Sequence, residues 1–236
     1  MRILAFFIVF IFISSINAQT VDKQGRKQGY WKKMDDKGNV IYEGEFKDDK
    51  PTGWFKHYYP GDTARRSVTY YKNNAKIAYS TTYYQIKGKM MASGKYLDEL
   101  KDSVWTFYDD GGALISKDNY KKGKKEGKCI VYLPDGKVAE EKMYKDGIEN
   151  GPVKQYYDGK TVKMEGNYKN GLLEGKVTYY YPNGVAAAQG VMKNGSKEGL
   201  WMYKEKDGKI KEKEVYKNGQ PLSKKETEEY LKKKKK

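Results

Sequence analysis

The sequence predicts an all-β protein: an elongated, single-layer antiparallel β-meander of about eight stacked hairpin repeats, followed by a short C-terminal helix. Three observations predict this fold: a recurring glycine, regularly spaced turn dipeptides and aromatic residues that keep the same phase. The unit is 24 residues long, with one extra residue in each of two units. Glycine starts most units, and Ala78 and Ser103 take its place in two of them: Gly29, Gly53, Gly127, Gly151, Gly175 and Gly199.

Two turn signals punctuate each unit, as the stretch from Gly175 to Gly195 illustrates. Asn183-Gly184 and Asn194-Gly195 are dipeptides typical of type I′ hairpin turns, in which both central residues have positive φ. Related dipeptides arrive about every 12 residues along the chain, and the short segments between them are rich in Tyr and Val. This alternation predicts about 16 consecutive antiparallel strands.

The aromatic residues keep a fixed distance from each repeat start. Alternate residues of a strand share one face, so stacked repeats would place equivalent side chains in ladders across the sheet. The chain has 23 Tyr and a mean hydropathy of −0.95, which suits a sheet with little covering it. We take one tyrosine ladder as a candidate binding surface, because Tyr gives a large contact area at a low entropic cost. Its members lie five residues after the repeat starts: Tyr58, Tyr83, Tyr108, Tyr132, Tyr156 and Tyr180.

A lysine begins most of the second turns and forms a second candidate surface. In stacked repeats these lysines would form a row along one edge, with about 10 Å between neighbours, and an anionic polymer could lie along it. The alternative is that they only solvate the turns and block edge pairing. The row consists of Lys47, Lys72, Lys121, Lys145, Lys169, Lys193 and Lys217.

The organisation outside the array is also readable. Residues 1–18 resemble a secretory signal peptide, with Arg2, the apolar run Ile3 to Ile13 and cleavage near Ala18. We therefore expect export to the periplasm, the cell surface or the medium; an uncleaved anchor is the alternative. Residues 19–28 should be a loose lead-in, 29–222 the β-repeat array and 223–236 a Lys-rich helical tail that starts at a capping box.

Reactive constellations are scarce, and we expect neither an enzyme nor a cofactor or metal site. The sequence has one histidine and one cysteine. We interpret Cys129 as a packing residue and His57 as a solvated strand residue. Acidic pairs such as Asp109-Asp110 lie at predicted turns, and no phosphate-binding glycine loop or nucleophile elbow is present.

One segment of the array resembles a known repeat. Tyr42-Glu43-Gly44-Glu45-Phe46-Lys47 is similar to the core of MORN repeats, and Glu165-Gly166-Asn167-Tyr168 is a further copy. The complete unit is closer to the MORN-variant repeats of bacterial proteins. Members of that family are sometimes labelled the antitoxin half of a toxin–antitoxin system, so the resemblance implies antitoxin-like partner binding as one hypothesis. The third repeat, with Ala78 and Leu97-Asp98-Glu99, departs most from the pattern.

The leading functional hypothesis is a non-catalytic, exported repeat protein that offers an interaction or scaffold surface to another protein of the cell envelope. A second hypothesis is that the lysine row binds an anionic glycan or lipid, in keeping with the net charge of +16. Nucleic acid fits the charge, but the predicted export disfavours it as a partner. The sequence does not specify an oligomeric state.

Overall fold

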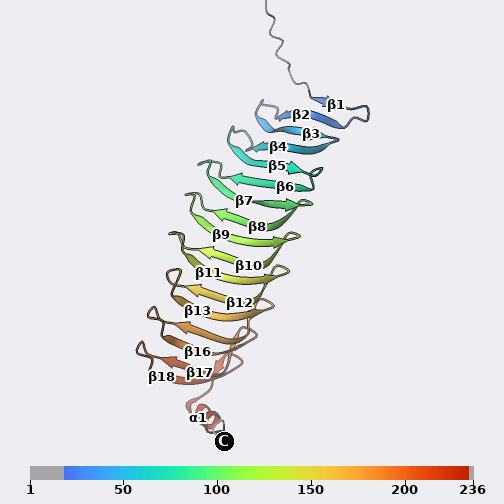
Figure 1. Ribbon diagram of the computed structural model, residues 1–236. Helices are drawn as coiled ribbons and strands as arrows, with labels where there is room; N and C mark the ends of the chain where they lie inside the picture. The colour runs from blue at the N-terminus through green and yellow to red at the C-terminus, as the bar shows by residue number, and fades with distance from the viewer. Residues whose placement is uncertain (1–18, 234–236) are drawn as a thin grey trace, which may run out of the picture.

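The computed structural model describes residues 19–233. The predicted signal peptide, residues 1–18, and the tail residues 234–236 lie outside the described residues. The described chain forms one sheet of 19 strands with a single helix at its C-terminal end. Figure 1 shows the strands stacked like rungs from β2 at one end to β18 and α1 at the other. This elongated, antiparallel, all-β arrangement confirms the predicted fold class.

The strands alternate in direction along the chain. Sixteen of them have six or more residues, the number predicted, and three are two-residue strands that the turn pattern did not reveal. Their bounds are β1 (Thr20–Val21), β2 (Lys27–Met34), β3 (Val40–Lys47), β4 (Lys50–Tyr58), β5 (Arg65–Lys72), β6 (Ile77–Tyr83), β7 (Met90–Leu97), β8 (Leu100–Tyr108), β9 (Leu114–Lys121), β10 (Lys124–Tyr132), β11 (Val138–Lys145), β12 (Ile148–Tyr156), β13 (Val162–Lys169), β14 (Leu172–Leu173), β15 (Gly175–Tyr180), β16 (Ala186–Lys193), β17 (Ser196–Lys204), β18 (Ile210–Lys217) and β19 (Gln220–Pro221).

Pairing follows the order of the chain. Each long strand pairs antiparallel with the next, and β13 pairs with both β14 and β15 because a break at Glu174 divides one strand into two. The segment predicted as a loose lead-in contributes β1, which pairs with β2 through Thr20↔Gln28 and Val21↔Lys27. The topology is therefore an open meander.

The recurring glycine has a conformational reason. At the repeat starts Gly53 has φ 61° and Gly127 has φ 79°, values in the left-handed region that glycine adopts without strain. The register of the flanking pair shifts there, so the residue marks a β-bulge. Ser103 keeps the same conformation, with φ 60°. Ala78 does not, and β5 and β6 pair in unbroken register through it. The third repeat has thus lost its bulge.

The two sets of turns differ, and the single turn type predicted for both is wrong for one set. In the second set both central residues have positive φ, as at Asn194 (49°) and Gly195 (77°), which confirms type I′. In the first set only the glycine does, as at Gly184 (82°). There the N–H of Gly184 donates to the carbonyl of Tyr181 and the N–H of Tyr181 to that of Val185, closing a longer loop. This loop is longer than the two-residue type I′ turn, so it closes with only one residue in the left-handed region.

One face of the sheet, which we call the core face, holds the side chains two residues after the repeat starts. Phe55, Trp105 and Trp201 are 1–4% exposed although no second layer covers them. Each ring lies over a glycine of the preceding strand: Gly44, Gly94 and Gly190. A Cβ atom at any of these glycines would lie less than 3.0 Å from the ring. The indole N–H of Trp105 also donates to the carbonyl of Lys95 at 2.9 Å.

The size of the core-face side chain depends on the residue that faces it on the preceding strand. Cys129 faces Asp118, and Val153 faces Lys142, so a smaller residue stands where the facing position is not glycine. Val177 is the exception, because it packs beside Gly166 of the preceding strand and forms a small apolar cluster with Val153 and Met164. At the other steps each hairpin matches its neighbour by volume, which is how a single layer excludes water from its centre.

The C-terminal helix α1 (Lys224–Lys233) follows the array as predicted. Its capping box is formed: the backbone N–H of Ser223 donates to the Glu226 carboxylate at 2.9 Å, and the Ser223 hydroxyl donates to the same oxygen at 2.6 Å. The helix lies beside β18, and the Tyr230 hydroxyl would lie 3.5 Å from a Cβ placed at Gly199. It therefore covers part of the last repeat.

We predict that Gly94→Ala lowers the free energy of unfolding by about 1–3 kcal/mol, because the added methyl group overlaps the Trp105 ring. Thermal and urea unfolding monitored by tyrosine and tryptophan fluorescence will measure the loss. The double variant Gly94→Ala/Trp105→Val should recover part of the lost stability, because a valine leaves more room than the indole ring. Val177 already packs in this way beside Gly166 of the preceding strand.

Gly166→Ala is the matched control. Its added Cβ would lie 3.0 Å from a Val177 methyl group instead of a ring, so we expect a smaller loss than for Gly94→Ala. Equal losses for the two single variants, or no coupling in the double variant, would contradict the role given to the ring.

Candidate functional site

The core face contains lysines that the sequence reading missed. In five repeats the residue two before the start is Lys, and in four of them its half-buried ammonium group lies against aromatic rings. Lys101 is the central example: its Nζ lies 4.6 Å from the ring centroid of Trp105, 4.8 Å from Phe107 and 5.1 Å from Tyr120. Burial lowers the pKa of Lys101, and the Asp118 carboxylate opposes that shift. We call such an arrangement a lysine cage.

Lysine cages recur at both ends of the array. Lys27 lies 4.8–5.8 Å from three rings, and Lys197 lies 4.7–5.2 Å from three others. Lys125 has one ring, Tyr144 at 5.2 Å, and an ion pair with the buried Asp118 at 2.8 Å. Burial works against the charge of Lys125, but the bond to Asp118 raises its pKa overall. The core face thus accommodates ammonium groups between rings and carboxylates.

The third repeat has no lysine cage. Its position two before the start is Lys76, but the missing bulge at Ala78 moves this residue to the end of the turn. The position two after the start is Ser80, which is buried and shares a 2.9 Å hydrogen bond with Thr69 where other repeats have a ring over a glycine. Both the ring and the lysine are therefore absent from this place.

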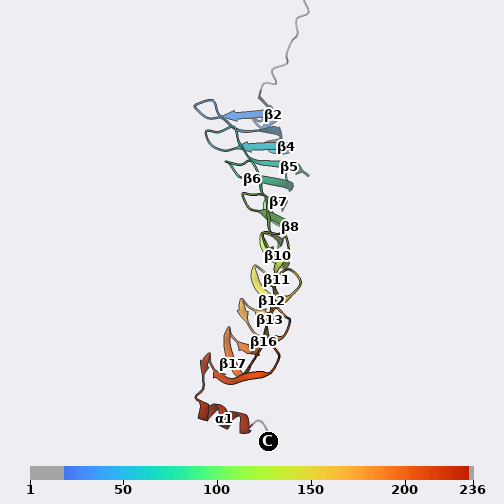
Figure 2. The same cartoon turned by 90° about the vertical axis from the view of Figure 1, so that its left-hand side faces the viewer.

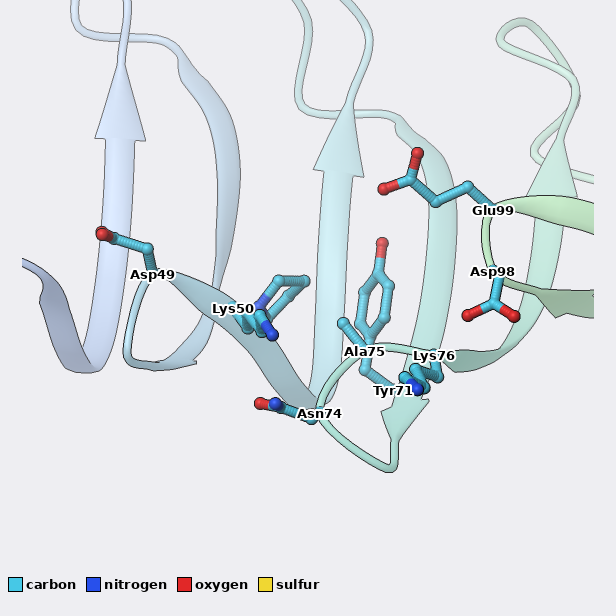
Figure 3. Close-up of a pocket in the computed structure, with 9 residues that line it drawn as sticks. Asp49, Lys50, Tyr71, Asn74, Ala75, Lys76, Asp98 and Glu99 are labelled. Atoms are coloured by element: carbon cyan, nitrogen blue, oxygen red, sulfur yellow. The ribbon is translucent and has the colours of Figure 1, made fainter.

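A cavity of about 300 Å³ occupies the place on the core face, and we call it the pit. Thr69, Ala78 and the rings of Tyr71 and Tyr96 line it, with Ala75 and Glu99 at its outer side. It continues through Tyr71 and Glu99 into a hollow of about 560 Å³ at the sheet edge. Figure 3 shows Tyr71 standing between the strands, with its hydroxyl end and the Glu99 carboxylate directed into the same space.

The rim of the pit is acidic although the chain is strongly basic. Asp49, Asp98 and Glu99 contribute three carboxylates, against two ammonium groups from Lys50 and Lys76. Within residues 19–233 no ion pair joins these lysines to these carboxylates. Burial, together with the charge of Glu99, raises the pKa of Tyr71. The pit therefore combines aromatic walls with negative charge.

The six predicted tyrosines lie on the opposite face, which we call the tyrosine face. All six are half-buried, so their rings pack beside neighbours instead of standing free. Three of the hydroxyls reach glutamates of the preceding strand: Tyr58 donates to Glu43 at 2.8 Å, Tyr156 to Glu141 at 3.4 Å and Tyr180 to Glu165 at 2.5 Å. The ladder geometry is thus as predicted, while a binding role for these residues remains a prediction.

The most exposed aromatic residue of the tyrosine face escaped the sequence reading. Trp54 is 65% exposed and stacks on Tyr70, with ring centroids 4.9 Å apart. Tyr79 and Val104, which are 48% and 46% exposed, lie along the same shallow groove of about 780 Å³. We call these four residues the Trp54 patch. A signal existed in the sequence: the residue after the repeat start is apolar in these repeats but Lys128, Pro152 or Lys176 in later ones.

The predicted lysine row is present as a feature of the fold. Its seven members end β3, β5, β9, β11, β13, β16 and β18, so they lie at one edge of the sheet, and all are exposed. The row is interrupted at β7, which ends in Leu97 followed by Asp98 and Glu99. The acidic rim of the pit therefore lies within a basic edge.

The residues considered for chemistry lie apart. Cys129 is 4% exposed, and burial raises the pKa of its thiol, so the packing interpretation agrees with the structure. The prediction that His57 is solvated is wrong. Its ring lies 5.2 Å from Phe55 and 6.0 Å from Tyr42, and burial lowers its pKa. Among residues 19–233 no group of three or more His, Cys, Asp or Glu residues could hold a metal ion. Nor does the helix of the described chain have the length and apolar character to span a bilayer.

Comparison with known families identifies several of the repeats. The MORN repeat variant matches residues 125–146, 149–170 and 197–218, and the MORN repeat matches residues 42–53 and 165–185. Such repeats generally bind proteins or membranes and are generally not enzymes. No curated protein matches the chain significantly. Residues 54–124 lie between the matched segments, and most of the pit and of the Trp54 patch lies there.

Glu43 gives the tyrosine face a pH-dependent contact. It accepts hydrogen bonds from Lys56 at 2.9 Å and from the Tyr30 and Tyr58 hydroxyls at 2.8 Å each. The bond from Lys56 contributes most to lowering the pKa of Glu43 to about 2, against burial. Burial, then the bond to Glu43, raises the pKa of Tyr58 to about 12.

We predict that this contact stabilises the N-terminal repeats at neutral pH and is lost in acid. The folded-state pKa of Glu43 is below its ordinary value of 4.5, so its contribution is complete above that value and disappears as the pH falls towards about 2. Thermal unfolding across this range should show a smaller loss for Glu43→Gln than for the parent chain. Glu45→Gln, an exposed neighbour on the same strand, should behave like the parent; identical acid profiles for all three chains would contradict the prediction.

Proposed function

We propose that this chain, a MORN-variant repeat protein, is a non-catalytic interaction module whose Trp54 patch docks on another protein. The carrying observation is the 65% exposure of Trp54 on a rigid strand. Tryptophan and tyrosine are the residues that most often dominate binding energy at protein interfaces. The partner surface should be apolar at the centre of the contact, with a polar rim.

The position of the patch supports the proposal. Strands β4, β5, β6 and β8 supply its four residues, and these strands pair in sequence through β7, so the groups are held by ladder hydrogen bonds instead of by loops. A surface fixed in this way loses little conformational entropy when a partner binds. Its repeats also carry the greatest departures from the family pattern, as expected where a repeated scaffold acquires an individual surface.

The proposal includes the place of action. The signal-like sequence of residues 1–18 favours export, so the partner that we propose is a protein of the cell envelope. The same patch would serve an antitoxin-like role if the bound protein were a toxin.

We predict that Trp54→Ala reduces recovery of the bound protein by at least about tenfold, the effect of removing an interface hot spot. A photo-cross-linking residue at position 79 should trap one defined protein in the native envelope, and the trapped amount measures binding. Because Trp54 is largely exposed, its loss should leave the melting temperature almost unchanged.

Ile210→Ala is the matched control, because Ile210 is 53% exposed on β18 at the far end of the array. It should leave the cross-linked amount unchanged. Equal trapping by the parent, Trp54→Ala and Ile210→Ala chains would rule out the Trp54 patch as the docking surface.

The uninterrupted part of the lysine row favours a second candidate function, the binding of an anionic glycan or lipid headgroup. Five members from Lys121 to Lys217 stand at successive turns of the second set without a break, at the ends of β9, β11, β13, β16 and β18, and all are exposed. Ammonium groups in such a row attract a linear polyanion, and salt weakens the attraction.

We predict that Lys145→Gln/Lys169→Gln/Lys193→Gln elutes from immobilised heparin at a lower salt concentration than the parent chain, because the row loses three charges in sequence. Lys37→Gln/Lys160→Gln/Lys206→Gln removes the same charge from the opposite edge, where all three residues are exposed in turns of the first set. Equal elution of the two triple variants would show that only total charge matters and would remove the row as a site.

A further inference from the structure

The pit of the third repeat lies apart from the Trp54 patch, on the other face of the sheet, and no residue of the patch lines it. What the pit can bind is indicated by what the chain itself places at the equivalent positions. Three repeats put a lysine ammonium group among three rings each, at 4.6–5.8 Å from the ring centroids. At these distances the ring quadrupole attracts a cation.

Of the three ring positions of a lysine cage, the third repeat keeps Tyr96 and lacks the lysine, while Tyr71 of the second repeat supplies another ring. Tyr71 and Tyr96 stand on β5 and β7, on either side of β6, and Ala78 and Thr69 form a buried floor between them. Lys76, the chain's own candidate, lies among the residues of the outer hollow and makes no cation–π contact with a described ring. The volume of about 300 Å³ is at the lower end of the range for ligand sites and leaves room for a lysine side chain.

Glu99 supplies a negative charge to the pit, as Asp118 does to the cages of Lys101 and Lys125. It takes the turn position that glycine takes in later repeats, with φ 64°. The carboxylate raises the pKa of Tyr71, which places its charge near the ring. No hydrogen bond or ion pair joins Glu99 to another residue of the described chain, whereas Asp118 of the fourth repeat is paired with Lys125.

We propose that the pit binds the side-chain ammonium group of a lysine supplied by a partner protein. The aliphatic stem would lie between Tyr71 and Tyr96, and the ammonium group would reach Glu99 at the rim. Asp98 and Asp49 extend the negative charge outwards, beside the two rim lysines, Lys50 and Lys76. The proposal rests on the proposed function only for the source of the lysine.

The test uses a small probe, so that it does not require the partner. Nα-acetyl-lysine N-methylamide is titrated into the full chain at low salt while the ring resonances of Tyr71 and Tyr96 are followed by NMR. We expect saturable shifts confined to the pit, and binding several-fold weaker for the norleucine analogue, which has the same stem without the charge. Glu99→Gln should weaken binding of the lysine probe about three- to fivefold, as loss of a partly exposed ion pair does.

Glu212→Gln is the matched control, because Glu212 is an exposed carboxylate of β18 far along the array. It should leave probe binding unchanged, and equal melting temperatures will show that all variants fold. The proposal is overturned if the probe gives no saturable shift, if Glu99→Gln binds as tightly as the parent, or if the norleucine analogue binds equally well.

The two proposals fail separately. Trp54→Ala should bind the lysine probe like the parent chain while losing the cross-linked partner. If the lysine probe binds but no partner is trapped at position 79, the proposal for the pit stands and that for the Trp54 patch is overturned. If a partner is trapped but the probe does not bind, the proposal for the Trp54 patch stands and that for the pit is overturned.

Discussion

The contact of a core-face side chain with the residue opposite it on the preceding strand governs the structure. A sheet without a second layer has to exclude water by packing each hairpin on its neighbour. Trp105 over Gly94 and Trp201 over Gly190 do this with a ring that fills the space of an absent side chain. Where the facing residue has a side chain, as at Asp118, the core-face residue shrinks to Cys129. Stability is therefore shared between neighbouring repeats and depends on matched volumes at most of the steps.

The same constraint explains why the third repeat is the place where a site can form. Ala78 removes the bulge, the register of β5 and β6 becomes continuous, and Ser80 replaces a ring. The lost bulge displaces the lysine and the serine replaces the ring, so both groups are missing from a single place on the core face. The neighbouring strands still hold Tyr71 and Tyr96 on either side, because their own pairs are intact. What remains is a cavity with ordered walls.

Periodicity predicted the fold because its signals are local. Asn194-Gly195 specifies a turn from two residues, and the spacing of Tyr58 and Tyr83 fixes their common face. The cages were not predictable in this way. Lys27 and Lys101 look like solvated charges in a sequence with 47 Lys and Arg residues, and only register shows that they point at rings. The exposure of Trp54 was missed for the same reason. A periodic pattern reveals the features that recur in every repeat, whereas the candidate sites lie where the repeats differ.

The distribution of charge relates the lysine row at the sheet edge to the acidic rim of the pit. A net charge of +16 repels basic partners at long range, so a site for a cation needs a local reversal of the field. That reversal lies where Leu97, Asp98 and Glu99 interrupt the lysine row. A partner that approaches with an anionic surface towards the row and one lysine towards the gap would match both signs in a single orientation. Mixed charge of this kind fixes register more than it raises affinity. The interruption of the repeat, and not the repeat itself, would then decide which partner the array accepts.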